Sequence, residues 1–374
     1  MNIVVILTFE VSLVDWKNAG IIQRELALYN ELSRKYNYSF TFITFGDKRD
    51  LQFTDMLNDA TVIPIYMYIK KSNFKILKFL KSIFVINKIK HLINTPNIVK
   101  TNQLLGFWVG IGIKLKYKCP LLVRTGYDAM SFAIKNKKTF LKKIFYFLMT
   151  QIALLISDKY TVTTQADKTF LTKHFISKKS KILVMPNWVA EQSLFKKIEK
   201  RKNEVVAVGR LENQKNFSYL IKELGKSEFK LNIVGKGSLQ DKLSFISKKY
   251  QTDITFLEPM NNTDLFKYLA NFKFFVLPSN FEGNPKVLLE AMSLGCVVLS
   301  NRFIGVDEVI DNYKDGIIFD TNDGELLSIL ETIKNKDDLL NSLSEEAIKK
   351  IQEKFSLRSY LESENKLYKS LLKN

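Results

Sequence analysis

The sequence contains little cysteine, histidine, proline or glycine. Its 374 residues include two cysteines, two histidines, seven prolines and 15 glycines, whereas hydrophobic residues make up 46%. So few cysteines and histidines exclude a disulfide framework and a Cys/His zinc site, and they suit a reducing cytosol. The sparse proline and glycine exclude a fibrous or disordered chain. The length favours two folded domains with a cleft between them.

Long hydrophobic runs are also missing. The first residues, Met1 to Leu7, lack the basic region of a signal peptide and are predicted to form a buried strand. The longest apolar stretch, residues 144–156, is interrupted by Tyr146, Thr150 and Gln151 and is shorter than the roughly 20 residues that a spanning helix needs. We therefore expect no transmembrane segment and a cytoplasmic protein.

Acidic residues are scarce in one part of the chain. Residues 1–200 contain 32 basic and 13 acidic residues, whereas residues 201–374 contain 25 of each. Residues 61–150 contain 17 basic residues and a single acid, Asp128. The net charge of +19 therefore arises in the amino-terminal half, which we expect to meet an anionic partner. No recognisable nucleic-acid reader module accompanies the charge, so we expect no nucleic acid as partner.

Short apolar runs alternate with helix-length amphipathic segments throughout the chain. In the carboxyl-terminal half the predicted strands are 205–208, 231–234, 274–277 and 297–299. In the amino-terminal half they are 3–7, 40–45, 61–66, 98–101, 121–124 and 160–164, with helices at about 19–35 and 140–156. This βαβ rhythm predicts an α/β protein with parallel sheets, whose ligands gather at the carboxyl ends of the strands.

The domain bounds follow from the same reading. We predict an amino-terminal Rossmann-like domain over residues 1–186, a mixed and charged linker over 187–202, and a second Rossmann-like domain over 203–354. Residues 355–374 are predicted to form an amphipathic helix.

The run from Phe281 to Gly295 carries the strongest helix signals. Asn284 is predicted to cap a helix, Pro285 to occupy its first position, and Gly295 to end it in the left-handed conformation. The first turn of such a helix, placed after a buried strand, offers free N–H groups and a positive dipole end to a phosphate.

Two carboxylates flank the start of this helix. Glu282 lies in the preceding loop and Glu290 about six residues inside the helix, roughly 9 Å along its axis. We expect them to contact different parts of one ligand, while Gly283 allows the backbone to approach it closely. The alternative is a pair of solvated charges around a well-capped helix. A glycoside hydrolase also uses two carboxylates, but their place beside a phosphate-binding helix favours nucleotide binding.

Two cations follow another predicted strand. Arg210 ends the strand and Lys215 follows within a short loop, so both lie near the same sheet edge and can neutralise a diphosphate. Ordinary surface charges are the alternative. The glycine-rich turn at residues 234–238 either packs close to a nucleotide or is a simple strand-to-helix turn.

Together these residues resemble the retaining glycosyltransferases of the GT-B fold, family 4 (glycosyl transferases group 1), over most of residues 201–320. The pattern of Glu, Gly, any residue and Pro, with a second Glu eight positions after the first, is met by Glu282, Gly283, Pro285 and Glu290. The Gly-Arg and Lys-Asn segment of that family is met by Gly209, Arg210, Lys215 and Asn216.

The resemblance implies a fold and a set of roles. The fold is α/β, with two Rossmann-like domains facing each other across a cleft. Binding of the donor diphosphate is assigned to Arg210, Lys215, Gly20, Val287 and Leu288. The ribose is assigned to Glu290 and the transferred sugar to Glu282, Gly283 and Asn284, with Glu282 as a catalytic residue. The family uses no metal and no cofactor, and its final helix packs back onto the amino-terminal domain.

The amino-terminal domain departs from the family pattern. Its first loop has a single glycine, Gly20, and the position where many relatives carry a sugar-facing histidine lies in a stretch without one. We expect Arg124, Tyr127 and Asp128 to take that place, with Asp128 as a second catalytic residue because it is the only acid in a basic stretch.

Residues 70–93 mix lysines with Phe, Ile and Leu at near-helical spacing, as an interfacial helix does. An ordinary helix of a lysine-rich domain is the alternative. With the basic charge, this segment predicts peripheral attachment to an anionic membrane on the cytoplasmic face of the inner membrane.

The sequence thus predicts a metal-independent hexosyltransferase. Its donor is a UDP- or GDP-sugar, its acceptor a glycan or lipid-linked glycan, and its setting bacterial surface polysaccharide synthesis, that is, capsule, O-antigen or lipopolysaccharide. A nucleotide-sugar epimerase of similar fold and a non-catalytic nucleotide-sugar-binding subunit are the alternatives.

Overall fold

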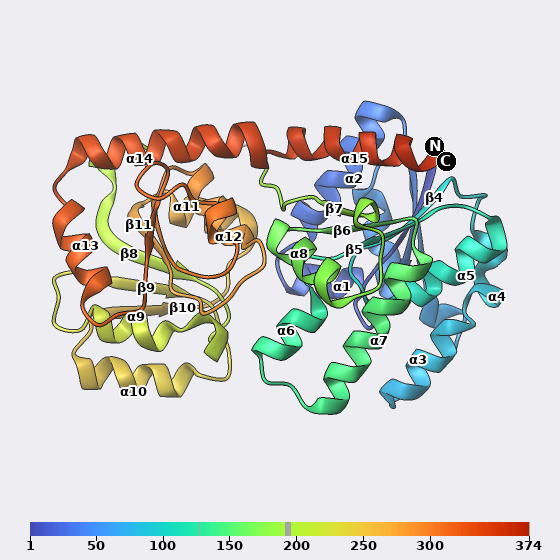
Figure 1. Cartoon of the computed structure of the whole chain (residues 1–374), viewed down its shortest axis with the longest axis horizontal. Coiled ribbons are helices and arrows are strands. Elements are labelled where there is room, and N and C mark those ends of the chain that lie inside the picture. The colour runs from blue at the N-terminus through green and yellow to red at the C-terminus, as the bar shows by residue number, and fades with distance from the viewer. Residues whose placement is uncertain (127, 191–195, 374) are drawn as a thin grey trace. The chain divides into compact units, whose positions relative to one another are not determined.

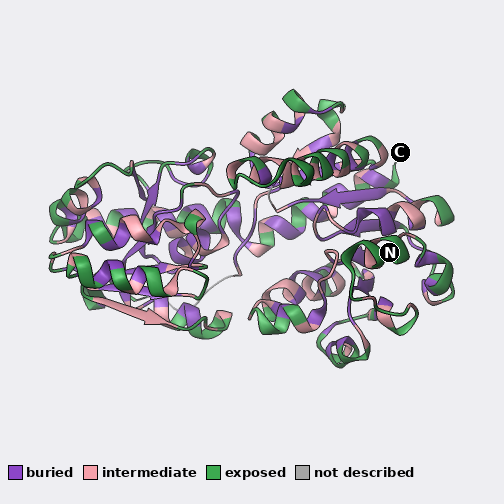
Figure 2. Cartoon of the chain, turned by 90° about the horizontal axis from the view of Figure 1, so that it is seen from below, coloured by how far each residue is buried: buried purple, intermediate pink, exposed green. Residues whose placement is uncertain are grey.

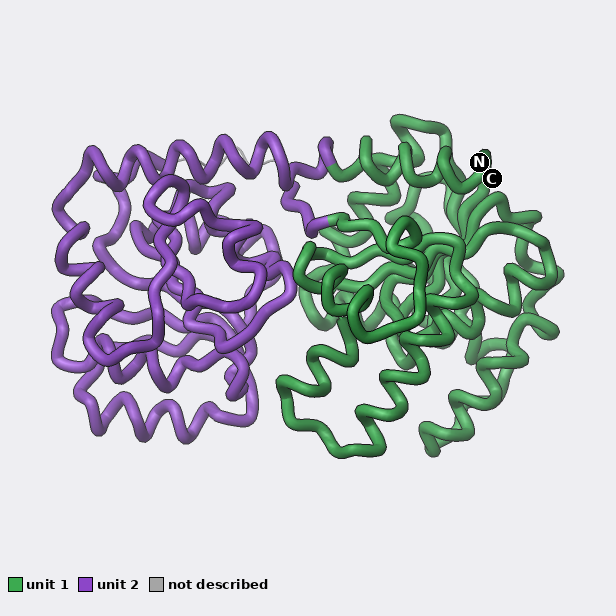
Figure 3. The backbone as a smooth tube through the Cα atoms, in the orientation of Figure 1, with its two compact units in different colours: residues 1–185, 360–374 green, residues 186–359 purple. Residues whose placement is uncertain are grey.

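The computed structural model describes residues 1–126, 128–190 and 196–373. The chain divides into two compact units (Figure 3). The amino-terminal unit contains Met1–Met185 and Tyr360–Asn374, and the carboxyl-terminal unit contains Pro186–Ser359.

The amino-terminal unit is built on a seven-stranded parallel sheet. Its order is β3-β2-β1-β4-β5-β6-β7. The strands are β1 (Asn2–Ile6), β2 (Ser39–Thr44), β3 (Ala60–Pro64), β4 (Ile98–Thr101), β5 (Leu121–Arg124), β6 (Lys159–Val162) and β7 (Ile182–Val184). Because helices cover both faces of such a sheet, the central strands are apolar runs rather than alternating ones.

Helices connect these strands and cover the sheet. They are α1 (Leu13–Asn18), α2 (Ile22–Tyr36), α3 (Lys75–Ile83), α4 (Ile86–Ile89), α5 (Phe107–Tyr117), α6 (Ala129–Lys135), α7 (Phe140–Ile156) and α8 (Gln165–His174) (Figure 1). Side chains of α4, α5, α7 and α8 share one core with the same face of the strands. On the other face, Tyr29 of α2 packs edge-on against the rings of Phe40 and Phe42 of β2.

The carboxyl-terminal unit contains a six-stranded parallel sheet of order β10-β9-β8-β11-β12-β13. Its strands are β8 (Lys202–Val208), β9 (Leu231–Val234), β10 (Ile254–Leu257), β11 (Phe272–Leu277), β12 (Val297–Asn301) and β13 (Ile317–Phe319). Its helices are α9 (Phe217–Glu223), α10 (Gln240–Tyr250), α11 (Asn262–Leu269), α12 (Lys286–Ser293), α13 (Glu325–Ile333) and α14 (Asp337–Lys350). Most strand residues are buried (Figure 2), but all four residues of the edge strand β10 are only half-buried.

The last helix, α15 (Leu357–Leu372), adds its residues from Tyr360 onward to the amino-terminal unit. Glu364 forms a buried ion pair with Lys100 of β4, and both side chains are 1% exposed. The Tyr368 hydroxyl donates to Glu364 and lies 3.3 Å from the Lys100 ammonium. Nearer the start of α15, the Tyr360 hydroxyl accepts a hydrogen bond from Arg124 Nε at 3.3 Å. These buried polar contacts fix α15 to the amino-terminal unit.

The predicted strands are confirmed, but three helical predictions need correction. The helix predicted at about 19–35 is α2, which begins only at Ile22, because the chain leaves α1 at Asn18 and turns at Gly20, whose φ is +69°. Residues 70–93 form α3, α4 and a 3-10 turn rather than a continuous helix. Asn284 is not a helix cap, as described below.

Candidate active site

The candidate site lies in the carboxyl-terminal unit, in loops that follow neighbouring parallel strands. Strand β8 lies between β9 and β11, so the loops after these three strands emerge at one edge of the sheet. The β8 loop contains Arg210 and Lys215, and the β11 loop contains Glu282 and leads into α12. The structure therefore brings the motif residues of this unit to one sheet edge, as predicted from the βαβ rhythm.

The β8 and β11 loops are bound directly to each other. The Lys215 ammonium lies 2.6 Å from Glu282 Oε1, and the two side chains are 13% and 10% exposed. Two further bonds flank this pair: Gln214 Nε2 donates to the Phe281 carbonyl at 2.9 Å, and the Asn280 amide donates to the Gln214 carbonyl at 2.9 Å. The predicted phosphate ligand Lys215 and the predicted sugar ligand Glu282 therefore neutralise each other here.

Glycines let the β8 and β9 loops pack backbone against backbone. A Cβ on Gly235 would lie 1.9 Å from the Gly209 carbonyl oxygen, and one on Gly237 would lie 2.5 Å from the Leu211 carbonyl oxygen. A Cβ on Gly209 would meet the Lys215 side chain at 3.0 Å. These glycines thus serve loop packing and the seating of Lys215, which favours the turn interpretation of residues 234–238.

Helix α12 starts differently from the prediction. Pro285 occupies the N-cap position without a side-chain cap, so the helix proper begins at Lys286. Asn284 Oδ1 instead accepts a hydrogen bond from the Asn187 amide at 2.9 Å, and the Asn284 carbonyl accepts from Asn187 Nδ2 at 2.6 Å. The side-chain oxygen of Asn284 is therefore bonded to the segment that precedes β8 and does not cap α12. At the other end Gly295 has φ of +72°, so its predicted left-handed stop is confirmed.

The first turn of α12 keeps one uncommitted amide. The Leu288 amide already donates to the Pro285 carbonyl at 3.1 Å, and the Leu289 amide contacts the same oxygen at 3.4 Å. The Val287 amide makes no hydrogen bond to the part of the chain that the structure describes. Glu290 lies one turn further along and is 3% exposed. Of the two predicted first-turn donors, Val287 is therefore the one available to an anion.

Arg210 is an exposed and unpartnered charge of the site, among the residues that the structure describes. Its side chain is exposed, and within residues 1–126, 128–190 and 196–373 its guanidinium has no hydrogen bond or ion pair. A guanidinium carries five N–H donors and matches a phosphate in bidentate fashion. Arg210 is thus the group at this edge whose donors are free for a ligand.

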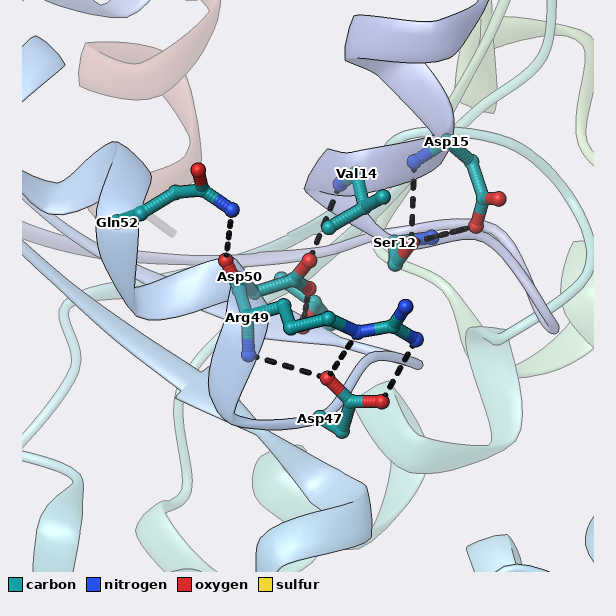
Figure 4. A network of polar contacts seen from close by, with 8 residues as sticks. Ser12, Val14, Asp15, Asp47, Arg49, Asp50 and Gln52 are labelled. Atoms are coloured by element: carbon teal, nitrogen blue, oxygen red, sulfur yellow. Dashed lines mark hydrogen bonds and ion pairs between the residues drawn. The ribbon is translucent and has the colours of Figure 1, made fainter.

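The predicted residue Gly20 lies in the amino-terminal unit. Its amide donates to the Lys17 carbonyl at 2.9 Å and Gly20 follows the end of α1, so its assignment to the donor diphosphate stays a prediction. The opposite end of α1 is also occupied, as Figure 4 shows: the Val14 amide donates to Asp50 at 3.1 Å and the Asp15 amide to Ser12 at 3.1 Å. The Val14 and Asp15 amides are therefore already bonded within the protein.

A second carboxylate in Figure 4 has a purely local role. Arg49 donates to both carboxylate oxygens of Asp47 at 2.9 Å, and these bonds lower the pKa of Asp47 to about 2. Gln52 closes the same turn by donating to the Arg49 carbonyl at 2.7 Å.

The residues predicted to replace the missing histidine are mostly interior. Arg124 is 8% exposed and lies against Tyr360 and the Asn102 carbonyl, so it supports α15. Asp128 is 0% exposed and caps α6 by accepting from the Ser131 amide at 2.6 Å. Burial raises the pKa of Asp128 to about 7. Its catalytic role stays a prediction, and Tyr127 lies outside the described residues.

Sequence reasoning missed two side chains of the site. Gln214 and Asn187 hold the β11 loop from two different segments, at sequence separations of 67 and 97 residues from their partners. The only signal in the sequence was the amide type of both side chains and, for Gln214, its place next to Lys215. Among the described residues, no group of three His, Cys, Asp or Glu side chains is arranged to hold a metal ion.

Comparisons with known proteins point to glycosyltransferases. Residues 190–350, which contain both loops, match the family model of glycosyl transferases group 1. An uncharacterized glycosyltransferase of Haemophilus influenzae is 26% identical over 317 residues, which cover 82% of this chain and 83% of the relative. The UDP-Gal:alpha-D-GlcNAc-diphosphoundecaprenol alpha-1,3-galactosyltransferase of Escherichia coli is 25% identical over 346 residues, covering 86% and 87% of the two chains.

A solved structure resembles the chain over nearly its whole length. The Anabaena protein HepE, solved with UDP and glucose, superposes with a TM-score of 0.76 at 14% identity and covers 99% of this chain and 100% of its own. At that identity the likeness concerns the fold. The chain therefore has the GT-B fold, with two parallel-sheet Rossmann-like domains, and its similarities support a glycosyltransferase of group 1.

Proposed function

We propose that the chain transfers a hexose-type sugar from a UDP- or GDP-sugar to a glycan or lipid-linked acceptor during bacterial surface polysaccharide synthesis. The observation that carries the proposal is the sheet edge where the free Arg210 guanidinium and the Lys215–Glu282 pair meet the start of α12. The Escherichia coli relative, whose name specifies a UDP-galactose donor and a diphosphoundecaprenol acceptor, supports the donor and acceptor classes.

The Lys215–Glu282 pair suggests how the donor is received. Arg210 and the Val287 amide bind the diphosphate, whose charge draws Lys215 away from Glu282 because a diphosphate is the stronger anion. Release of Lys215 frees the Glu282 carboxylate to accept hydrogen bonds from the transferred sugar. Glu290 binds the ribose. As the bond to the sugar breaks, Arg210 and Lys215 stabilise the charge that develops on the leaving diphosphate.

The same cations make a metal dispensable in this proposal. Two basic side chains and a helix N-terminus supply the positive charge that a divalent ion would otherwise bring to the diphosphate. We therefore expect transfer to persist in excess EDTA. Retention of the anomeric configuration follows from the resemblance to family 4.

Membrane attachment is the second part of the proposal. The helix α3, within the predicted interfacial segment, exposes several apolar side chains between lysines, and residues 61–150 carry 17 basic residues against one acid. We propose that the protein is bound peripherally at the cytoplasmic face of the inner membrane. No described helix is both long and apolar enough to cross a membrane.

Turnover of a donor panel tests the enzymatic part. UDP-, GDP- and ADP-sugars are incubated with the full chain and a lipid-linked acceptor mixture, and nucleotide release and sugar incorporation are measured with and without EDTA. We expect release and incorporation from one donor class, and their loss in Arg210→Ala. Conversion of a donor sugar to its epimer without acceptor would replace transferase by epimerase, and no turnover of any donor by wild type would overturn the proposal.

A further inference from the structure

Helix α7 turns an apolar face outward. Eight of its apolar side chains are exposed. Six of these share one side of the helix and form what we call the α7 stripe: Leu141, Ile144, Phe145, Leu148, Ile152 and Leu155. Leu141 is 78% exposed and Leu155 56%. The buried residues of this 17-residue helix are Thr150, Ala153 and Leu154. A helix of a globular protein ordinarily does the reverse and buries its apolar face.

The α7 stripe is continuous along the helix. At about 100° per residue, its six side chains fall within an arc of roughly 100°, and Thr150, Ala153 and Leu154 lie on the opposite side. Apolar residues recur here at intervals of four and three, as on the contact face of an amphipathic helix: Leu141, Phe145, Leu148, Ile152 and Leu155. An apolar surface of this length on a soluble unit indicates an interaction site.

A second exposed stripe lies on the same layer of helices. Helix α3 exposes Ile76, Leu77 and Leu80, and Phe84 follows directly after it. The inner face of α3 is fixed to α5 through Phe79, whose ring lies 4.7 Å from that of Trp108. All of these helices cover one face of the sheet, and Figure 1 draws both α3 and α7 along the lower edge of the amino-terminal unit.

Helix α5 also ties the end of α7 to this layer. The Lys114 ammonium of α5 donates to the Ile156 carbonyl at 3.0 Å and pairs with Asp158 at 2.5 Å. The α7 stripe therefore belongs to a helix whose carboxyl-terminal end is fixed to the rest of the unit.

Basic side chains gather at the start of the α7 stripe. Residues 129–157 contain five lysines and no acid, and Lys142 and Lys143 lie in the first turn of α7. A surface of exposed leucine, isoleucine and phenylalanine bordered by lysine complements an anionic lipid interface. Two copies of the chain would instead oppose like charges across such a contact, which is costly.

We propose that α7, together with α3, is the element that inserts into an anionic bilayer. Helix α7 lies in the plane of the interface, with the α7 stripe among the upper acyl chains and its lysines at the phosphates. With 17 residues, about 25 Å long, it stays at one leaflet. This inference deepens the membrane part of the proposed function, on which it rests, and it moves the main contact from residues 70–93 to residues 140–156.

Vesicle binding of full-length variants tests the inference. The probe is vesicles of phosphatidylcholine with 30% phosphatidylglycerol, compared with pure phosphatidylcholine. We expect Leu141→Gln/Leu148→Gln to bind the anionic vesicles at least about tenfold more weakly than wild type, since two large apolar side chains lose their acyl environment. The matched control is Phe245→Gln/Leu372→Gln, which replaces exposed apolar residues outside α7 and should bind like wild type.

The depth of insertion distinguishes apolar insertion of the α7 stripe from purely electrostatic binding at the membrane surface. Leu148→Trp fluorescence should be quenched by brominated acyl chains, whereas Phe245→Trp fluorescence should not. Equal binding by the α7 stripe variant and the control, or an unquenched Leu148→Trp on bound vesicles, would overturn the inference. Self-association abolished by the stripe variant, without vesicle binding, would assign the surface to a second copy instead. Donor-induced thermal stabilisation is measured in parallel, so a failure of membrane binding is distinguished from a failure of the donor site.

Discussion

The Lys215–Glu282 pair predicts a specific pattern of stability losses. At 2.6 Å and an effective dielectric of about 20, the attraction between the two charges is of the order of 6 kcal/mol before desolvation. Removing one partner of a buried pair costs about 3–5 kcal/mol, and the residual exposure of 13% and 10% reduces this to about 2–3 kcal/mol. Glu282→Gln and Lys215→Met should each lower the free energy of unfolding by that amount.

A double-mutant cycle in urea measures the coupling. Because each single change leaves the other charge unpaired, the double variant Lys215→Met/Glu282→Gln should lose little more than either single variant, giving a coupling of about 1.5 kcal/mol or more. Strictly additive losses would show that the two charges do not interact in solution.

The same variants separate the two roles in the proposed mechanism. In Glu282→Gln, the UDP diphosphate no longer competes with a carboxylate for Lys215, so UDP should bind at least as tightly as to wild type while sugar transfer falls. In Lys215→Met, both should fall. Titration calorimetry gives the affinities, and a Glu282→Gln variant that binds UDP more than about tenfold more weakly would refute the exchange of partners.

Three further predictions concern contacts inside the individual units. Glu364→Gln should cost about 3–5 kcal/mol in urea unfolding because it leaves the Lys100 ammonium buried, and Lys100→Met/Glu364→Leu should recover most of it; an equal loss in both would contradict the pairing. Burial, with a smaller contribution from nearby Asp167, raises the pKa of Asp128 to about 7, so its contribution to stability is present below about pH 4 and lost as the pH rises to 7. The free energy of unfolding of wild type should therefore fall by up to about 4 kcal/mol between pH 4 and pH 7. Asp128→Asn should remove this fall, since Asn still caps a helix but does not ionise, and an unchanged pH profile would count against the prediction. Gly235→Ala should cost about 1–3 kcal/mol, because its Cβ would press on the carbonyl of Gly209, and a thermal melt like wild type would disprove this contact.

Much of the fold could be predicted because it depends on local chemistry. Central strands such as Phe272–Leu277 are nearly continuous apolar runs, and Gly295 stops α12 through its own backbone freedom. Strands β7, β10 and β13 escaped prediction. They have three or four residues each, and β10 is only half-buried, so an edge strand of this kind leaves a weak apolar signal.

The contacts within the site could not be predicted in the same way. Asn284 looks like a helix cap from its neighbours in the sequence. In the structure, however, Asn187, 97 residues away, donates hydrogen bonds to both its side-chain and its main-chain carbonyl oxygen. Lys215 and Glu282 each suggest a ligand contact, and only the three-dimensional structure brings them together. The apolar nature of residues 144–156 was evident, whereas the outward direction of the α7 stripe depends on which face the sheet covers.

Binding of UDP and GDP to wild type, Arg210→Ala and Arg34→Ala, measured by titration calorimetry, tests the central claim most directly. Arg34 is an exposed arginine on α2, 71% accessible, and serves as the matched control. The account predicts that wild type and Arg34→Ala bind one of the nucleotides equally, and that Arg210→Ala binds it roughly 10- to 100-fold more weakly, as loss of charged hydrogen bonds implies. Binding of neither nucleotide to wild type, or equal affinity in Arg210→Ala, would contradict a donor site at the carboxyl edge of β8 and β11.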